Sequence, residues 1–184
     1  MSVKADPAFI EILIAIDACN LFKDITPGKT IDKPACLDHP TANKYIVMMV
    51  APMSLMTSQK PDANLQIKAR TNDVIRWRSA SFARLSNDVL LVGFNKVSSH
   101  GVLSTAHLVP VQKYSLVQKT ENPNDLVLEL VTDSRWEVTC MTKGYDDYNF
   151  TFAVIEPGTN DLKDPSHAKV LGYYKFDPRI NVDF

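Results

Sequence analysis

Four of the six methionines lie close together, at Met48, Met49, Met53 and Met56. Thioether sulfurs are soft ligands that select Cu(I), so such a cluster is a candidate metal site. Met48 and Met49 are neighbours in an extended segment and point to opposite faces, which keeps them from joining one site easily. We therefore favour methionines that fill gaps in the core, with Met53 and Met56 forming an exposed surface for self-association or a partner.

Trp77 stands between Arg76 and Arg78. In a strand the tryptophan points one way and both arginines the other. An aromatic wall beside fixed guanidinium donors could bind a sugar or an anionic ligand. We favour a structural interpretation, in which Trp77 is a core residue and its flanking arginines pair with acids on a neighbouring strand. Trp136 is likewise expected to be a core residue.

The remaining polar residues form no recognisable catalytic or metal-binding motif. The four histidines fall in expected loops without His-x-x-x-His spacing; they are His39, His100, His107 and His167. Asp146 and Asp147 with Asp161 and Asp164 could supply oxygen ligands to calcium, but no Asp-x-Asp-x-Asp-Gly loop is present. A nucleophile elbow and a glycine-rich phosphate loop are also absent. The sequence therefore predicts no cofactor, no metal and no catalytic residue.

Composition narrows the class of protein further. Twenty basic and twenty-one acidic residues give a net charge of -1, which indicates no nucleic-acid partner and permits self-association. Three cysteines, Cys19, Cys36 and Cys140, are too few, and odd in number, for a disulfide framework. The N-terminal apolar run lacks a small-residue cleavage site and reads as a first strand rather than a signal peptide, so a cytoplasmic location is expected by default. The apolar run 9–16 is interrupted by Glu11 and is far too short to cross a bilayer. Asp17, which closes this run, is expected to cap a helical turn at 18–23.

Apolar residues alternate with polar ones along most of the chain. The clearest case is 148–155, where Tyr148, Phe150, Phe152 and Val154 share one face. Further strands are expected at 9–17, 45–51, 65–69, 74–81, 89–96, 111–119, 126–131, 135–142 and 170–176. The segment 24–43 reads as a long proline-rich connection, and the tail 180–184 is apolar enough to join a sheet edge. With almost no helical stripe between them, these strands predict an all-β, antiparallel sandwich or barrel in a single domain, 1–184.

Several of these segments resemble the PixA/AidA inclusion-body protein family. The resemblance begins at the opening strand 12–17, which ends in an aspartate, and continues through 45–48 and 72–81. It is clearest in 148–155 followed by Gly172-Tyr173-Tyr174-Lys175-Phe176-Asp177-Pro178. The order and spacing fit nearly the whole chain, whereas the segment after the first strand departs from the family pattern.

The resemblance implies an immunoglobulin-like β-sandwich in the bacterial cytoplasm, linked to inclusions, stress or quorum sensing. We expect a non-enzymatic protein that acts by binding or self-assembly, with a dimer formed by strand addition at an exposed edge. A carbohydrate-binding, lectin-like module is the alternative, motivated by the sandwich and by Trp77. A third hypothesis is a hydrolase with His107 or His167 beside a carboxylate.

Overall fold

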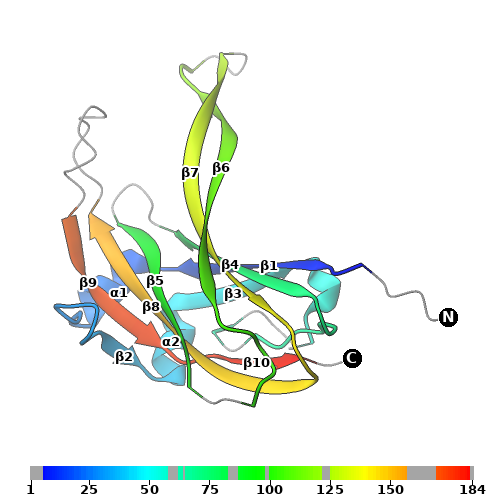
Figure 1. Ribbon diagram of the computed structural model, residues 1–184. Helices are drawn as coiled ribbons and strands as arrows, with labels where there is room; N and C mark the ends of the chain where they lie inside the picture. Colours follow the sequence, from blue (N-terminus) through cyan, green and yellow to red (C-terminus); the bar gives the residue numbers. More distant parts are fainter. Residues whose placement is uncertain are drawn as a thin grey trace.

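The computed structural model describes residues 6–57, 62–63, 65–82, 87–97, 100–121, 125–156 and 169–182. Two sheets carry almost all of the regular structure (Figure 1). The first sheet has the order β3-β1-β4-β7-β6; its strands are β1 (Phe9–Ile16), β3 (Ile46–Ala51), β4 (Val74–Ser81), β6 (His107–Gln118) and β7 (Leu126–Thr139). The second has the order β10-β8-β9-β2, with β5 also paired to β8; its strands are β2 (Ala35–Leu37), β5 (Asp88–Lys96), β8 (Gly144–Glu156), β9 (Lys169–Phe176) and β10 (Arg179–Val182).

The all-β prediction is confirmed, but the expectation of purely antiparallel pairing is wrong. β1 runs parallel to β4, and β2 runs parallel to β9. A parallel pair needs a long crossover, and the chain between β1 and β4 supplies one by forming β3 at the far edge of the sheet first. As expected, the chain after β9 continues along a sheet edge, where β10 pairs with β8.

The segment 24–43 is more ordered than a proline-rich connection. It holds β2 and the start of helix α2 (His39–Tyr45). Asp38 caps α2 by accepting a hydrogen bond from the Thr41 N–H, and Pro40 occupies the first turn, where no backbone donor is needed. The predicted cap at Asp17 is confirmed: its carboxylate accepts from the Asn20 N–H at the start of α1 (Ala18–Asp24).

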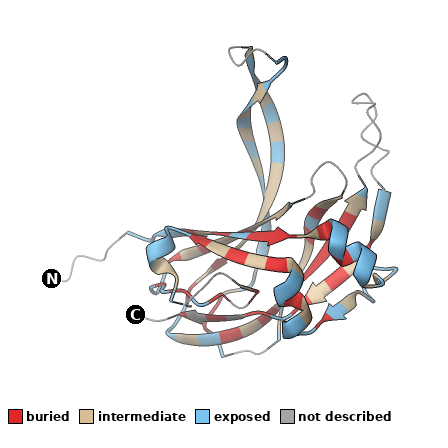
Figure 2. Cartoon of the chain, turned by 180° about the vertical axis from the view of Figure 1, so that it is seen from behind, coloured by how far each residue is buried: buried red, intermediate tan, exposed pale blue. Residues whose placement is uncertain are grey.

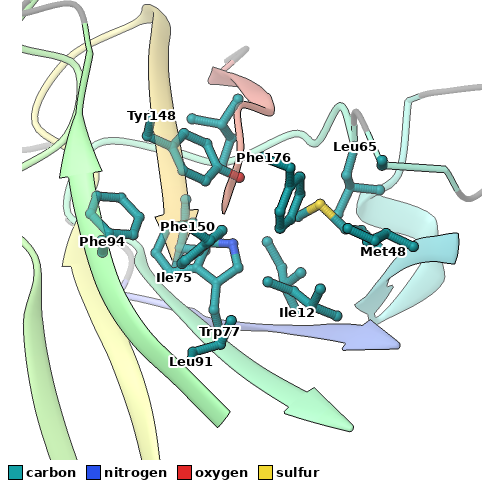
Figure 3. Packing of buried hydrophobic residues seen from close by; sticks show 14 of the residues in the cluster. Ile12, Met48, Leu65, Ile75, Trp77, Leu91, Phe94, Tyr148, Phe150 and Phe176 are labelled. Carbon is teal, nitrogen blue, oxygen red and sulfur yellow. The ribbon is translucent and has the colours of Figure 1, made fainter. Parts of the chain in front are cut away.

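The core lies between the two sheets (Figure 3). Trp77 is 0% exposed, and its ring contacts those of Phe94, Tyr148 and Phe150 at centroid distances of 5.3 to 5.6 Å. The predicted apolar face of β8 is therefore confirmed as the main contribution of the second sheet. Leu65, Ile67 and Ala69 are buried as their alternation indicates, yet this segment forms only isolated bridges through Ile67 rather than a strand.

A long hairpin of β6 and β7 leaves the body of the molecule (Figure 1). Two separate strands were expected at 126–131 and 135–142, but β7 runs without a break through Thr132, Asp133 and Ser134. Seen from behind, the outer part of the hairpin shows no buried residue (Figure 2). In the described part of the chain, no helix is long and apolar enough to cross a membrane.

Candidate functional site

The projecting part of the hairpin carries an exposed apolar surface. We call residues 111–121 and 125–133 the arm. Tyr114 lies opposite Leu130, and Leu116 lies opposite Leu128. With Leu126 these residues form what we call the apolar arm face; the exposed fractions are 71% for Tyr114, 60% for Leu116, 46% for Leu126, 63% for Leu128 and 57% for Leu130. Five large apolar side chains on one uncovered face are the kind of patch that marks a contact surface.

The apolar arm face continues the inner face of the first sheet. Alternation along β7 places Val138 in the core, Trp136 against it, and Leu130, Leu128 and Leu126 on the same side farther out. Within the body the second sheet covers this face. Along the arm no other described strand lies over it, so the same alternation presents leucines to solvent.

Charged side chains of the arm lie on its opposite face. Lys113 Nζ is 2.9 Å from Asp133 Oδ2, and Lys119 pairs with Glu129. The positions on the side of the apolar arm face carry no charge at all; they are Pro110, Gln112, Tyr114, Leu116, Gln118, Leu126, Leu128, Leu130, Thr132 and Ser134. The opposite face mixes these charges with Val111, Val117, Val127 and Val131, so the two faces differ in charge rather than in apolar content alone.

Asp133 anchors the charged face near the base of the arm. Partial burial acts to raise the pKa of this carboxyl. Hydrogen bonds from Lys113 and from the Ser134 N–H, with the nearby charges of Lys113 and Arg78, outweigh burial and lower the pKa. Asp133 therefore stays ionised and keeps its ion pair over the neutral pH range.

A cleft of about 860 Å³ lies at the base of the arm. The ladder between β4 and β7 ends at the pair Trp77 and Trp136, after which the two strands diverge. The cleft is lined by the end of β4, the start of β5 and residues from both faces of the hairpin, with Leu116 and Trp136 beside charged-face residues such as Lys113 and Asp133. On its side toward β4, residues 126–135 of β7 pair with no described strand, so the arm is attached to the body only at its base.

The residues around Trp77 form part of the core and of the sheet's ion pairs rather than a ligand site. Trp77 lies in the core and presents no face to a ligand. Arg76 pairs with Glu11 at 3.2 Å and Glu137 at 2.9 Å, and Arg78 pairs with Glu11 at 3.5 Å. These acids come from β1 and β7, the two neighbours of β4, so the guanidinium groups are engaged within the sheet.

The histidines contribute no assembled catalytic centre in the described residues. His107 Nε2 is 4.0 Å from Glu137 Oε2, but that carboxylate already pairs with Arg76 and Arg135. His100 lies 3.7 Å from Asp146. His167, Asp161 and Asp164 fall outside the described residues.

Asp146 has a structural role rather than an open ligand position. It is fully buried and accepts hydrogen bonds from the N–H groups of His100 and Leu103. Lys96 Nζ lies 3.4 Å from it. Among the described residues, no group of three or more His, Cys, Asp or Glu side chains is placed to hold a metal ion.

The methionines divide between the core and the surface. Met48 is buried in β3 beside Phe176 and Leu65 (Figure 3). Met53, in the short helix η1 (Met53–Leu55), is 52% exposed, and Met56 packs partly against the core. Of the two methionines expected at a contact surface, only Met53 is widely exposed.

Comparison with known proteins assigns the chain to a family. Residues 8–182 match the model of the PixA family, described as inclusion body protein. The chain belongs to the PixA inclusion-body family. A crystal structure of a PixA inclusion body protein from Burkholderia cenocepacia J2315 has a TM-score of 0.77, covers 100% of both chains and is 15% identical. At this identity the likeness shows a shared PixA fold. No match appears among curated proteins.

The PixA resemblance in the sequence is thereby confirmed, whereas the apolar arm face was not foreseen. Its signal is present as alternation in 111–119 and 126–131. That alternation predicts a face that is buried. The residues along these strands give no sign that the second sheet ends before it reaches them.

Proposed function

We propose that this PixA-family protein is a non-catalytic protein that self-assembles, and that two copies meet through the apolar arm face. The observation that carries the proposal is the uncharged row of exposed residues, Tyr114, Leu116, Leu128 and Leu130, on a hairpin held away from the body. Burying an exposed leucine contributes about 1–2 kcal/mol. Ten side chains, five from each copy, would then supply roughly 10 kcal/mol or more before the cost of association.

Charge distribution supports a second copy of this chain as the occupant. In a two-fold dimer the same patch meets itself, so any charge near the axis faces its own like charge. The apolar arm face carries none, and the pairs Lys113–Asp133 and Lys119–Glu129 lie behind it. The family description as inclusion body protein is consistent with assembly of like molecules. The net charge of -1 gives little long-range repulsion.

A cytoplasmic location is part of the proposal. All three cysteines are free. Free thiols are the usual state in a reducing compartment.

The test compares two single variants, one with a charge on the apolar arm face and one with a charge on the opposite face. Light scattering coupled to size-exclusion chromatography measures mass over a range of protein concentrations for the wild type, Leu116→Glu and Val117→Glu. We expect the wild type to form dimers or larger species, Leu116→Glu to be monomeric, and Val117→Glu to behave as wild type. Val117 is the matched control because it neighbours Leu116 and lies on the charged face.

Two results would contradict self-assembly through this face. One is a wild-type protein that stays monomeric at high concentration. The other is equal loss of assembly in both variants, with circular dichroism showing that both remain folded.

A further inference from the structure

A second concave site lies on the outer face of the second sheet, away from the arm. Its volume is about 420 Å³. The floor is built from neighbouring strands: Asn95 of β5 lies opposite Asn149 of β8, and Thr151 of β8 lies opposite Lys175 of β9. Cys36 of β2 is the next partner of Lys175. Residues 31–34 form the wall. Four strands thus bring polar side chains into one pocket.

The wall is fixed by backbone contacts. Gly28 and Tyr173 exchange two hydrogen bonds of 3.0 Å. Pro27 lies so close to Gly172 that a Cβ there would be 2.3 Å from the proline Cβ. The following turn is closed by a hydrogen bond of 3.1 Å from the Lys33 N–H to the Thr30 carbonyl. The pocket is therefore preformed, which lowers the cost of binding.

The pocket holds hydrogen-bonding capacity that the described residues do not use. Asn149 Oδ1 is buried without a hydrogen-bond partner. Within the part of the chain that the structure describes, the amines of Lys33 and Lys175 make no ion pair or hydrogen bond. Asp32 supplies one negative charge against these two positive ones. A buried polar group without a partner is uncommon and calls for a bound water or ligand.

We propose that this pocket binds a small organic anion that also carries hydroxyl groups, such as a sugar acid or a sugar phosphate. Lys175, assisted by Lys33, binds the anionic group. Asn95, Asn149 and Thr151 bind the hydroxyl groups, and a modest turn of the Asn149 amide brings its free oxygen to a hydroxyl donor. None of the described residues that line the pocket is aromatic, so a neutral sugar lacks the stacking surface that it would need.

Cys36 provides a direct readout of occupancy. Cys36 lines the pocket and is exposed, Cys19 is exposed on α1 and does not line it, and Cys140 is buried. A thiol reagent should therefore label two sites in the native protein. The rate at each site, measured by mass spectrometry, reports ligand protection at Cys36 with Cys19 as the internal control.

The probes are gluconate, glucose 6-phosphate, inorganic phosphate and glucose, each at roughly 10 mM and at equal ionic strength. We expect gluconate or glucose 6-phosphate to slow labelling of Cys36 about tenfold, with Cys19 unchanged. Comparing these two probes identifies a carboxylate or a phosphate as the preferred anion. Glucose and inorganic phosphate should protect weakly, because each supplies only half of the recognised chemistry.

Two lysine variants on β9 assign the effect to the pocket. Lys175→Met should abolish protection, whereas Lys169→Met, at a highly exposed position outside the pocket, should retain it. Calorimetric titration of the same variants gives an independent measure of affinity. The proposal is overturned if neither anion protects Cys36, if both variants lose protection equally, or if inorganic phosphate protects as well as glucose 6-phosphate.

Discussion

Trp77 of β4 lies opposite Trp136 of β7, and this pair is the last in the ladder between the two strands. Trp77 is enclosed by aromatic rings, while Trp136 is half-buried and donates a hydrogen bond of 3.3 Å from Nε1 to the Leu91 carbonyl of β5. Beyond the pair, β7 leaves the two-sheet body and becomes the arm. The two tryptophans therefore mark the boundary between the core and the proposed contact surface.

Substitution of the two tryptophans should have unequal effects on stability. Trp77→Ala is expected to lower the free energy of unfolding by about 3–5 kcal/mol, because it leaves a cavity among Phe94, Tyr148 and Phe150. Trp136→Ala should cost only about 1–3 kcal/mol, since its side chain is only partly buried at the edge of the core. Urea denaturation followed by circular dichroism measures both. If Trp136→Ala lowers the free energy of unfolding more than Trp77→Ala does, the core extends into the arm and the two tryptophans do not mark its boundary.

Removing the arm should separate assembly from folding. None of the fully buried core residues comes from the arm. A chain in which Asn-Gly replaces residues 112–132 joins Val111 to Asp133, which already lie opposite each other, through a two-residue hairpin turn. We expect its urea midpoint to stay close to that of the wild type, while light scattering shows a monomer. A shortened chain that unfolds would assign the arm a structural role instead.

Alkaline pH should destabilise the protein through Cys140. Burial, with the nearby negative charge of Asp73, raises the pKa of this thiol to about 12. In the unfolded chain the pKa is about 8.5. Folding therefore favours the neutral thiol over the thiolate. The contribution of the neutral thiol to the free energy of unfolding is complete below about pH 8.5 and is lost as the pH rises toward 12.

The measurement is urea denaturation with a reductant at several pH values between 8 and 11. Cys140→Ala should show a shallower decline than the wild type, by up to about 1.4 kcal/mol per pH unit. Cys19→Ala, at an exposed thiol, should follow the wild type. The buried tyrosine Tyr174, whose pKa burial also raises to about 12, contributes equally to all three proteins. Parallel curves for wild type and Cys140→Ala would contradict the assignment.

The sequence predicted well those features that depend on neighbours along the chain. Alternation in β8 identified Tyr148, Phe150 and Phe152 as core residues, and the same reasoning placed Trp77 inward with Arg76 paired on the other face. The cap at Asp17 follows from a single residue and the turn after it. In each case the controlling interaction is local, or is the period-2 burial that any half-covered strand shows.

Features that depend on distant partners were missed. β2 has three residues and exists because residues 35–37 pair with β9, which no local pattern reveals. Helix α2 has a local signal in Asp38 and Pro40, but the prolines spread through 24–43 predict only a connection there. The arm shows the same limit most clearly, because alternation along Leu126, Leu128 and Leu130 is identical whether or not an opposing sheet covers it.

The continuity between the inner face of the first sheet and the apolar arm face has a thermodynamic consequence. If a second molecule covers that face, the two hydrophobic interiors merge across the two-fold axis, and association contributes to the free energy that holds each chain folded. The melting temperature of the wild type should then rise with protein concentration, whereas that of Leu116→Glu should not.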